Sequence, residues 1–125
     1  MARLAWSMKG PDGINLVTDA MAAAGMPDGA YKLGDFAVQV KDGAVRLPDG
    51  TLAGSSLTLD RALRNLIRFT GCSLEDAVTT VTRTPARVLG NREVHIAAGE
   101  PATLTALSPE CEVTFTMRDG RPLFD

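Results

Sequence analysis

Aromatic side chains are scarce in this sequence, and long apolar runs are missing. Only 5% of its 125 residues are aromatic, with a single tryptophan and a single tyrosine. The core is therefore expected to be aliphatic, without the aromatic platforms on which single-stranded nucleic acids stack. The longest apolar run, around residues 20–26, is far shorter than the roughly 20 residues that cross a bilayer. We expect no membrane segment, and the first ten residues have no signal-peptide pattern.

Neither sign of charge dominates the sequence. Thirteen basic and fifteen acidic residues give a net charge of −2, and they form no block of like charge. A nucleic-acid partner is therefore not expected. The two cysteines, Cys72 and Cys111, have no metal-site spacing, which favours reduced thiols and a cytoplasmic protein. The length is that of one soluble domain.

Strand patterns occupy both ends of the chain. Apolar residues on consecutive positions predict a strand buried on both faces over Ile14–Thr18. Residues 31–47 alternate around Asp42–Gly43, which predicts a hairpin. A second hairpin is expected from residues 102–107 and 112–117, followed by a turn and a last edge strand over 122–124. The segment 51–56 has no clear period and is predicted to be a loop.

The middle of the chain has helical spacing. An apolar stripe predicts a helix over residues 57–70 that ends at Gly71, and its members are Leu59, Ala62, Leu63, Leu66 and Ile67. Arg61, Arg64 and Arg68 are expected on the solvated face. Ser73 should cap a second helix. Thr84 followed by Pro85 should open a short helix that ends at Gly90.

The lone carboxylate of Asp19 stands at the end of the predicted strand Ile14–Thr18. A strand buried on both faces needs parallel neighbours, and this chain contains only one candidate of that kind. Either the segment joins the antiparallel strands, or its partners lie on another polypeptide. We favour the second reading. By its position alone, Asp19 could be a catalytic group or a residue that caps the following loop.

Four segments of the sequence resemble a known family: LVTDAMAAAG (16–25), DGTLAGSSLTLDRALRNL (49–66), TRTPARVLG (82–90) and AAGEPATLTAL (97–107). They are similar to the C-terminal part of the N-acetylglucosamine-6-phosphate deacetylases, within the amidohydrolase superfamily. The resemblance implies an α+β fragment. Residues 1–30 and 49–95 would be the remnant of a (β/α)₈ barrel, with its last strand, substrate loop and closing helices. Residues 31–48 and 96–125 would be β-sandwich strands.

The resemblance also implies roles for single residues. Asp19 would be the general base and acid that removes a proton from water and returns it to the leaving amine. Leu52, Ala53 and Gly54 would contact an amino-sugar phosphate through their backbone. The divalent metal of the intact enzyme would be held by a glutamate and histidines on earlier strands, so no metal is expected on this chain. His95 would not be a metal ligand. Without the metal, the isolated chain would be inactive.

Two other classes of function stay open. The chain could be a truncated, non-catalytic paralogue that serves as a structural module and forms homo-oligomers through the edge of Ile14–Thr18. It could also be a small sugar-binding domain without catalysis. The segment 52–54 could likewise be a plain connection to the helix, with Ser56 or Thr58 as its N-cap.

Overall fold

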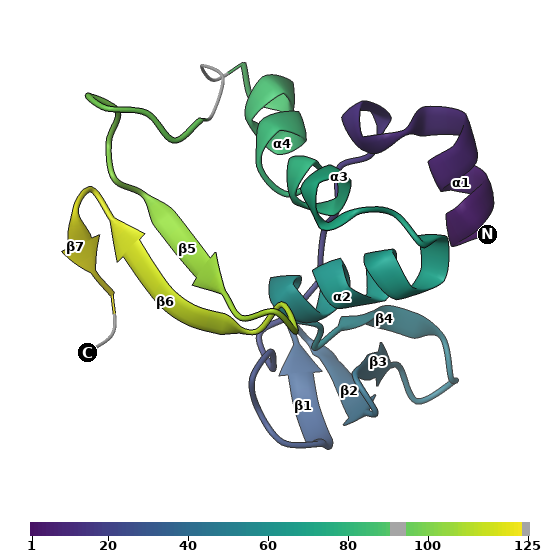
Figure 1. Ribbon diagram of the computed structural model, residues 1–125. Coiled ribbons are helices and arrows are strands. Elements are labelled where there is room, and N and C mark those ends of the chain that lie inside the picture. The colour runs from purple at the N-terminus through teal and green to yellow at the C-terminus, as the bar shows by residue number, and fades with distance from the viewer. Residues whose placement is uncertain (91–94, 124–125) are drawn as a thin grey trace. The chain divides into compact units, whose positions relative to one another are not determined.

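The computed structural model describes residues 1–90 and 95–123, and its elements are labelled in Figure 1. The chain divides into two compact units, although its length alone suggests one domain. One unit consists of residues 17–62, and the other of residues 1–16 and 63–125. The architecture is mixed α and β with two separate antiparallel sheets. No helix among the described residues is both long and apolar enough to cross a membrane.

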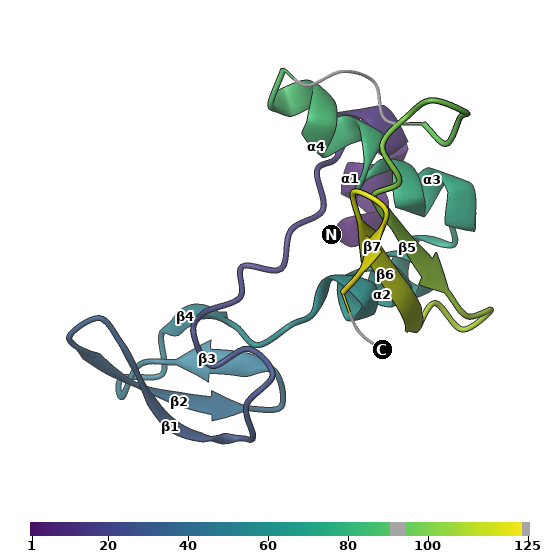
Figure 2. The same ribbon diagram turned by 90° about the vertical axis from the view of Figure 1, so that its left-hand side faces the viewer.

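The unit of residues 17–62 is built on a four-stranded antiparallel sheet in the order β1-β2-β3-β4, seen in Figure 2. Its strands are β1 (Gly29–Leu33), β2 (Phe36–Lys41), β3 (Ala44–Arg46) and β4 (Leu52–Ser55). The predicted hairpin turn is confirmed, because Asp42 and Gly43 join β2 to β3 with φ of 50° and 80°. Positive φ at both central residues matches the twist of paired strands.

One face of this sheet carries the apolar core of the unit. The alternation in β2 buries its third and fifth residues, and β3 adds one more, so that the buried strand residues are Val38, Val40 and Val45. Met21 and Ala23, from the segment before β1, complete the buried cluster. The stretch that follows Asp19 is therefore fixed by packing against the sheet.

The strand β4 corrects the predicted loop over residues 51–56. It pairs antiparallel with β3, with Val45 opposite Gly54, and the register shifts between Val45 and Arg46. The turn before it is closed by Asp49, whose carboxylate accepts a hydrogen bond of 2.9 Å from the Thr51 N–H. This bond, together with one from the Thr51 side chain, lowers the pKa of Asp49. The sequence did not predict this strand because LAGS has no alternation of apolar and polar residues. Its extended conformation depends on pairing with β3.

The predicted strand over Ile14–Thr18 is wrong. Residues 14–19 form no strand, although Ile14 is extended, and only Ala20 makes a single parallel bridge, to Ser55. The Leu16 N–H donates to the Thr80 carbonyl instead of to a sheet. The physical reason is that a ladder needs a partner strand along its whole length. Within the described part of this chain, the segment meets a single bridging residue, Ser55, and that residue pairs with Ala20.

The second unit contains most of the helices. They are α1 (Ala2–Lys9), the 3₁₀ turn η1 (Pro11–Gly13), α2 (Leu59–Thr70), α3 (Leu74–Thr79) and α4 (Arg83–Val88), with α2 entering the unit at residue 63. The apolar stripe is confirmed at Leu63 and Leu66, which are buried with Ala77 and Cys111, whereas its first member, Leu59, is exposed. The Ser73 cap is confirmed too, since its Oγ accepts a 3.1 Å hydrogen bond from the Asp76 N–H. Both cysteines are free thiols.

Two details of the helices differ from the prediction. The helix α4 begins at Arg83, and the buried Thr84 donates its hydroxyl to the Pro11 carbonyl at 3.0 Å instead of capping the helix. Arg64 is half-buried, and its guanidinium donates to the Cys111 carbonyl at 2.8 Å. The sequence predicted Thr84 as a helix cap and Arg64 on the solvated face. Both predictions failed because a sequence pattern does not show which distant carbonyl needs a hydrogen-bond donor.

The C-terminal sheet has the predicted hairpin. It consists of β5 (Leu104–Leu107), β6 (Val113–Arg118) and β7 (Arg121–Pro122) in that order. The last strand was predicted over 122–124, of which Phe124 lies outside the described residues.

Candidate functional site

Asp19 has an unusual backbone conformation. Its φ is 50°, in the left-handed region that non-glycine residues rarely adopt, although Asp and Asn tolerate it better than most. Its side chain is exposed. Among residues 1–90 and 95–123, no hydrogen bond or ion pair involves its carboxylate. A strained residue with an exposed, unengaged carboxylate is the kind of outlier that points to a function.

The backbone around Asp19 is held from both sides. Its carbonyl accepts a 2.9 Å hydrogen bond from the Ser55 N–H, and the Ser55 carbonyl accepts one of 3.0 Å from Met21. Met21 is only 9% exposed and sits in the apolar core of the sheet. The carboxylate is therefore presented from a fixed backbone into solvent.

The loop-capping reading of Asp19 is not what the structure shows. The Ala20 N–H bonds to the Thr18 hydroxyl at 3.3 Å. Two amides of the following turn, those of Ala24 and Met26, donate to backbone carbonyls. Since these donors have other acceptors, the Asp19 side chain does not cap the turn.

The segment 52–54 lies on β4, and only its last residue reaches Asp19. Gly54 has a φ of 132°, and a methyl group built on it would lie 3.2 Å from the Asp19 carbonyl oxygen. Ala53 packs against the core of the sheet, while Leu52 is exposed. A glycine is thus required at position 54 because its backbone closely approaches that of Asp19. The three residues of the segment lie in three different environments.

A methyl group at Gly54 should disturb the Asp19 segment. We expect Gly54→Ala to lower the free energy of unfolding by about 2–3 kcal/mol, because it combines positive φ with a backbone contact. Gly50→Ala is the matched control, since Gly50 has a φ of 87° and nothing within 4 Å of the added group. It should cost about 1 kcal/mol. Urea unfolding followed by circular dichroism measures both, and equal losses would contradict the contact.

Sequence reasoning missed Ser55. Its N–H, carbonyl and hydroxyl all bond to the segment 18–21, the hydroxyl donating to the Thr18 carbonyl. A serine after glycine in an unpatterned stretch carries no local signal. Only the pairing of Ser55 with Ala20 and Ala44 reveals it.

The described residues do not build a metal centre. In residues 1–90 and 95–123, no group of three or more His, Cys, Asp or Glu side chains could hold a metal ion. His95 is exposed, and its Nε2 lies 3.8 Å from an oxygen of Glu100. One imidazole and one carboxylate fall short of the three protein ligands of a typical catalytic zinc. The donor set on this part of the chain therefore does not fit a divalent metal.

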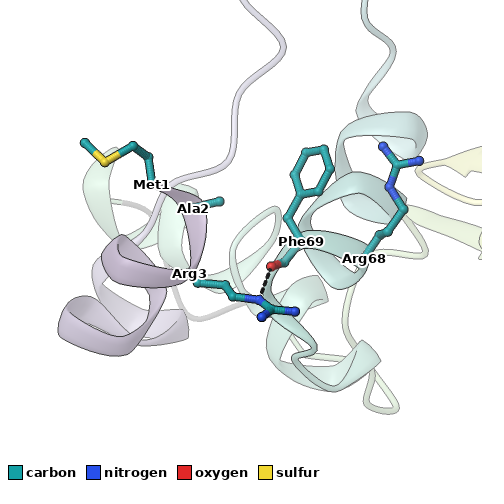
Figure 3. A pocket seen from close by; sticks show the side chains of 5 residues that line it. All are labelled: Met1, Ala2, Arg3, Arg68 and Phe69. Carbon is teal, nitrogen blue, oxygen red and sulfur yellow. Dashed lines mark hydrogen bonds between the residues drawn. The ribbon is translucent and has the colours of Figure 1, made fainter.

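A hollow of about 550 Å³ lies elsewhere, beside the start of α1 and the end of α2. Figure 3 shows the residues that line it: Met1, Ala2, Arg3, Arg68 and Phe69. The Arg3 Nε donates to the Phe69 carbonyl at 2.9 Å, and the Arg68 guanidinium lies 4.8 Å from the Phe69 ring. None of the residues predicted for a site lines this hollow, and it offers neither an acid nor a nucleophile.

Comparison with known proteins gives a consistent result. No profile of a known protein family matches the sequence. N-acetylglucosamine-6-phosphate deacetylase of Bacillus subtilis is 37% identical over 125 residues, which is 98% of this chain and 32% of the relative. The chain thus spans about a third of the length of the curated relatives it matches.

Solved structures agree. The crystal structure of the same enzyme from Thermotoga maritima superposes with a TM-score of 0.92 and 41% identity, over 99% of this chain and 34% of that one. A mutant of the Mycobacterium smegmatis enzyme in complex with N-acetyl-D-glucosamine-6-phosphate gives a TM-score of 0.88 and 36% identity over 96% of this chain and 33% of that one. Over nearly its whole length the chain is therefore similar, in sequence and in structure, to about a third of the length of the N-acetylglucosamine-6-phosphate deacetylases.

Proposed function

We propose that this chain is the proton-transferring part of an enzyme that hydrolyses N-acetylglucosamine 6-phosphate to glucosamine 6-phosphate and acetate. The observation that carries the proposal is the exposed carboxylate of Asp19 on a backbone fixed by Ser55 and Met21. The relatives named above support the substrate, since one of the solved structures contains this sugar phosphate.

The chemistry assigned to Asp19 is a proton transfer in two directions. As water attacks the acetamide carbonyl, the carboxylate takes a proton from the water. It then gives this proton to the nitrogen while the C–N bond breaks, so that the products are acetate and the sugar amine. One carboxylate can serve both steps when it lies within hydrogen-bond reach of the water and of the nitrogen. An exposed carboxylate that no residue in the described ranges 1–90 and 95–123 engages is available for both steps.

The substrate contacts proposed for this chain are the backbone groups of Leu52, Ala53 and Gly54. Gly54 supports this role, because its missing side chain leaves room beside the Asp19 backbone. The divalent metal of the intact enzyme is assigned to a glutamate and histidines on earlier strands, which this chain does not contain. We further propose that residues 1–30 and 49–95 belong to a barrel, and residues 31–48 and 96–125 to a β-sandwich. The two free thiols support a cytoplasmic location.

The test uses a complete enzyme that contains this chain. It is either the longer polypeptide, if the source cell makes one, or a chimera in which this chain replaces the matching third of the Thermotoga maritima enzyme. We expect release of acetate from N-acetylglucosamine 6-phosphate, and a much slower release from N-acetylglucosamine without the phosphate. A folded complete enzyme that releases no acetate from the phosphorylated sugar would refute the proposal.

A structural module is the second candidate. It is favoured by the exposure of large apolar side chains in the unit of residues 17–62, where Val17 is 63%, Phe36 65% and Leu52 62% exposed. Such surfaces are candidates for association with another chain.

If this module forms homo-oligomers, light scattering on the purified chain should give twice the monomer mass of 13.2 kDa. Val17→Lys should then shift the equilibrium towards the monomer, because it places a charge in the interface. Lys32→Glu, which changes charge at another exposed position of the same unit, is the control. A monomer at high protein concentration would contradict this candidate.

A further inference from the structure

We propose that Ser55 is a positioning residue for Asp19, acting through the Thr18 carbonyl. The inference rests on the proposed function, since it deepens the role of the same carboxylate. The hydroxyl of Ser55 donates to the Thr18 carbonyl and accepts a 3.2 Å hydrogen bond from the Leu57 N–H. It is half-buried and uses both its donor and its acceptor capacity.

The three bonds from Ser55 form a clamp around Asp19. The hydroxyl binds the carbonyl before Asp19, the N–H binds the Asp19 carbonyl itself, and the Ser55 carbonyl binds the amide of Met21. The peptide groups on both sides of Asp19 are thereby fixed. Since φ and ψ of a residue are the rotations between its two peptide groups, the clamp fixes the direction in which the Asp19 Cα–Cβ bond leaves the backbone.

The hydroxyl is the replaceable member of this clamp. The bonds of the Ser55 N–H and carbonyl remain with any residue at this position, because they belong to the backbone. Without the hydroxyl, the Thr18 carbonyl loses its donor, and Asp19 is less restrained against leaving its unfavourable φ of 50°. The carboxylate would then point in a range of directions. Misplacement by about 1 Å can cost roughly a hundredfold in rate.

The experiment compares variants of the complete enzyme defined above. Ser55→Ala should lower kcat by about tenfold to a hundredfold with KM unchanged within twofold. Ser55→Thr keeps the hydroxyl and should restore most of the rate. Ser55→Cys, of similar size but a weak donor, should behave like Ser55→Ala and serves if the alanine variant does not fold. Ser56→Ala is the control, since Ser56 uses its backbone N–H to bind the Gly43 carbonyl.

A double-mutant cycle separates positioning from general stability. In the Asp19→Asn background, Ser55→Ala should cause no further loss of kcat, because the group that it positions is already disabled. An equal loss in both backgrounds would overturn the inference and leave Ser55 a purely structural residue. A fully active Ser55→Ala beside an inactive Asp19→Asn would also overturn it, while the proposed function would stand. An active Asp19→Asn would instead refute the proposed function.

Discussion

Replacing Asp19 with asparagine in the complete enzyme is expected to lower kcat by about 10²–10⁴-fold and to leave KM nearly unchanged. The amide has the size and shape of the carboxylate and tolerates the left-handed φ of 50° at this position. It cannot take a proton from water. The change therefore removes the chemistry and keeps the geometry. Initial rates of acetate release from N-acetylglucosamine 6-phosphate measure the effect.

Asp42→Asn is a closely matched control. Asp42 has the same φ of 50°, is exposed, and lies in the β2–β3 turn of the same unit. It therefore tests whether an asparagine in this conformation, with the loss of one negative charge, affects the rate by itself. We expect wild-type kcat for Asp42→Asn. If both variants lose the same small factor, Asp19 is not the proton acceptor and the group must be sought on another segment.

Local patterns predicted the parts of the fold that local interactions determine. The hairpin of β2 and β3 was correct, because alternation and an Asp-Gly pair both act over a few residues. The α2 stripe and the Ser73 cap were correct for the same reason. Asp19 was singled out from its position after an apolar run, and the structure adds its positive φ and its unengaged carboxylate.

The errors concern contacts between distant residues. Thr84 bonds to Pro11, which lies 73 residues away, and Ser55 bonds to Thr18 over 37 residues. The strand β4 exists because β3 offers it a partner. Residues 14–18 form no strand, and the neighbouring Ala20 makes a single bridge to Ser55. None of these pairings changes the local pattern of apolar and polar residues. A single sequence therefore gave the candidate acid, and it gave Gly54 only as a substrate contact. It did not give Ser55, or the close approach of Gly54 to the Asp19 carbonyl.

The isolated 125-residue chain should release acetate at least about 10³-fold more slowly than the complete enzyme, if it releases any. Fixing a substrate beside a catalytic group supplies effective molarities of about 10⁵–10⁸ M. That gain requires contacts on several sides of the substrate. The chain is about a third of the length of its relatives, and its proposed contributions are one carboxylate and one stretch of backbone. Asp19 would then face bulk water and an unpositioned amide.

This result is informative only if the isolated chain is folded. Circular dichroism should show its helices and strands, and Val45→Ala, which creates a cavity at a residue with 0% exposure, should lower its stability by about 1–3 kcal/mol. Acetate release is then measured with and without added divalent metal ions. A metal-stimulated release that Asp19→Asn abolishes would show that 125 residues build a whole catalytic site. In that case the remaining two thirds of the relatives would contribute affinity and specificity, and not the reacting groups.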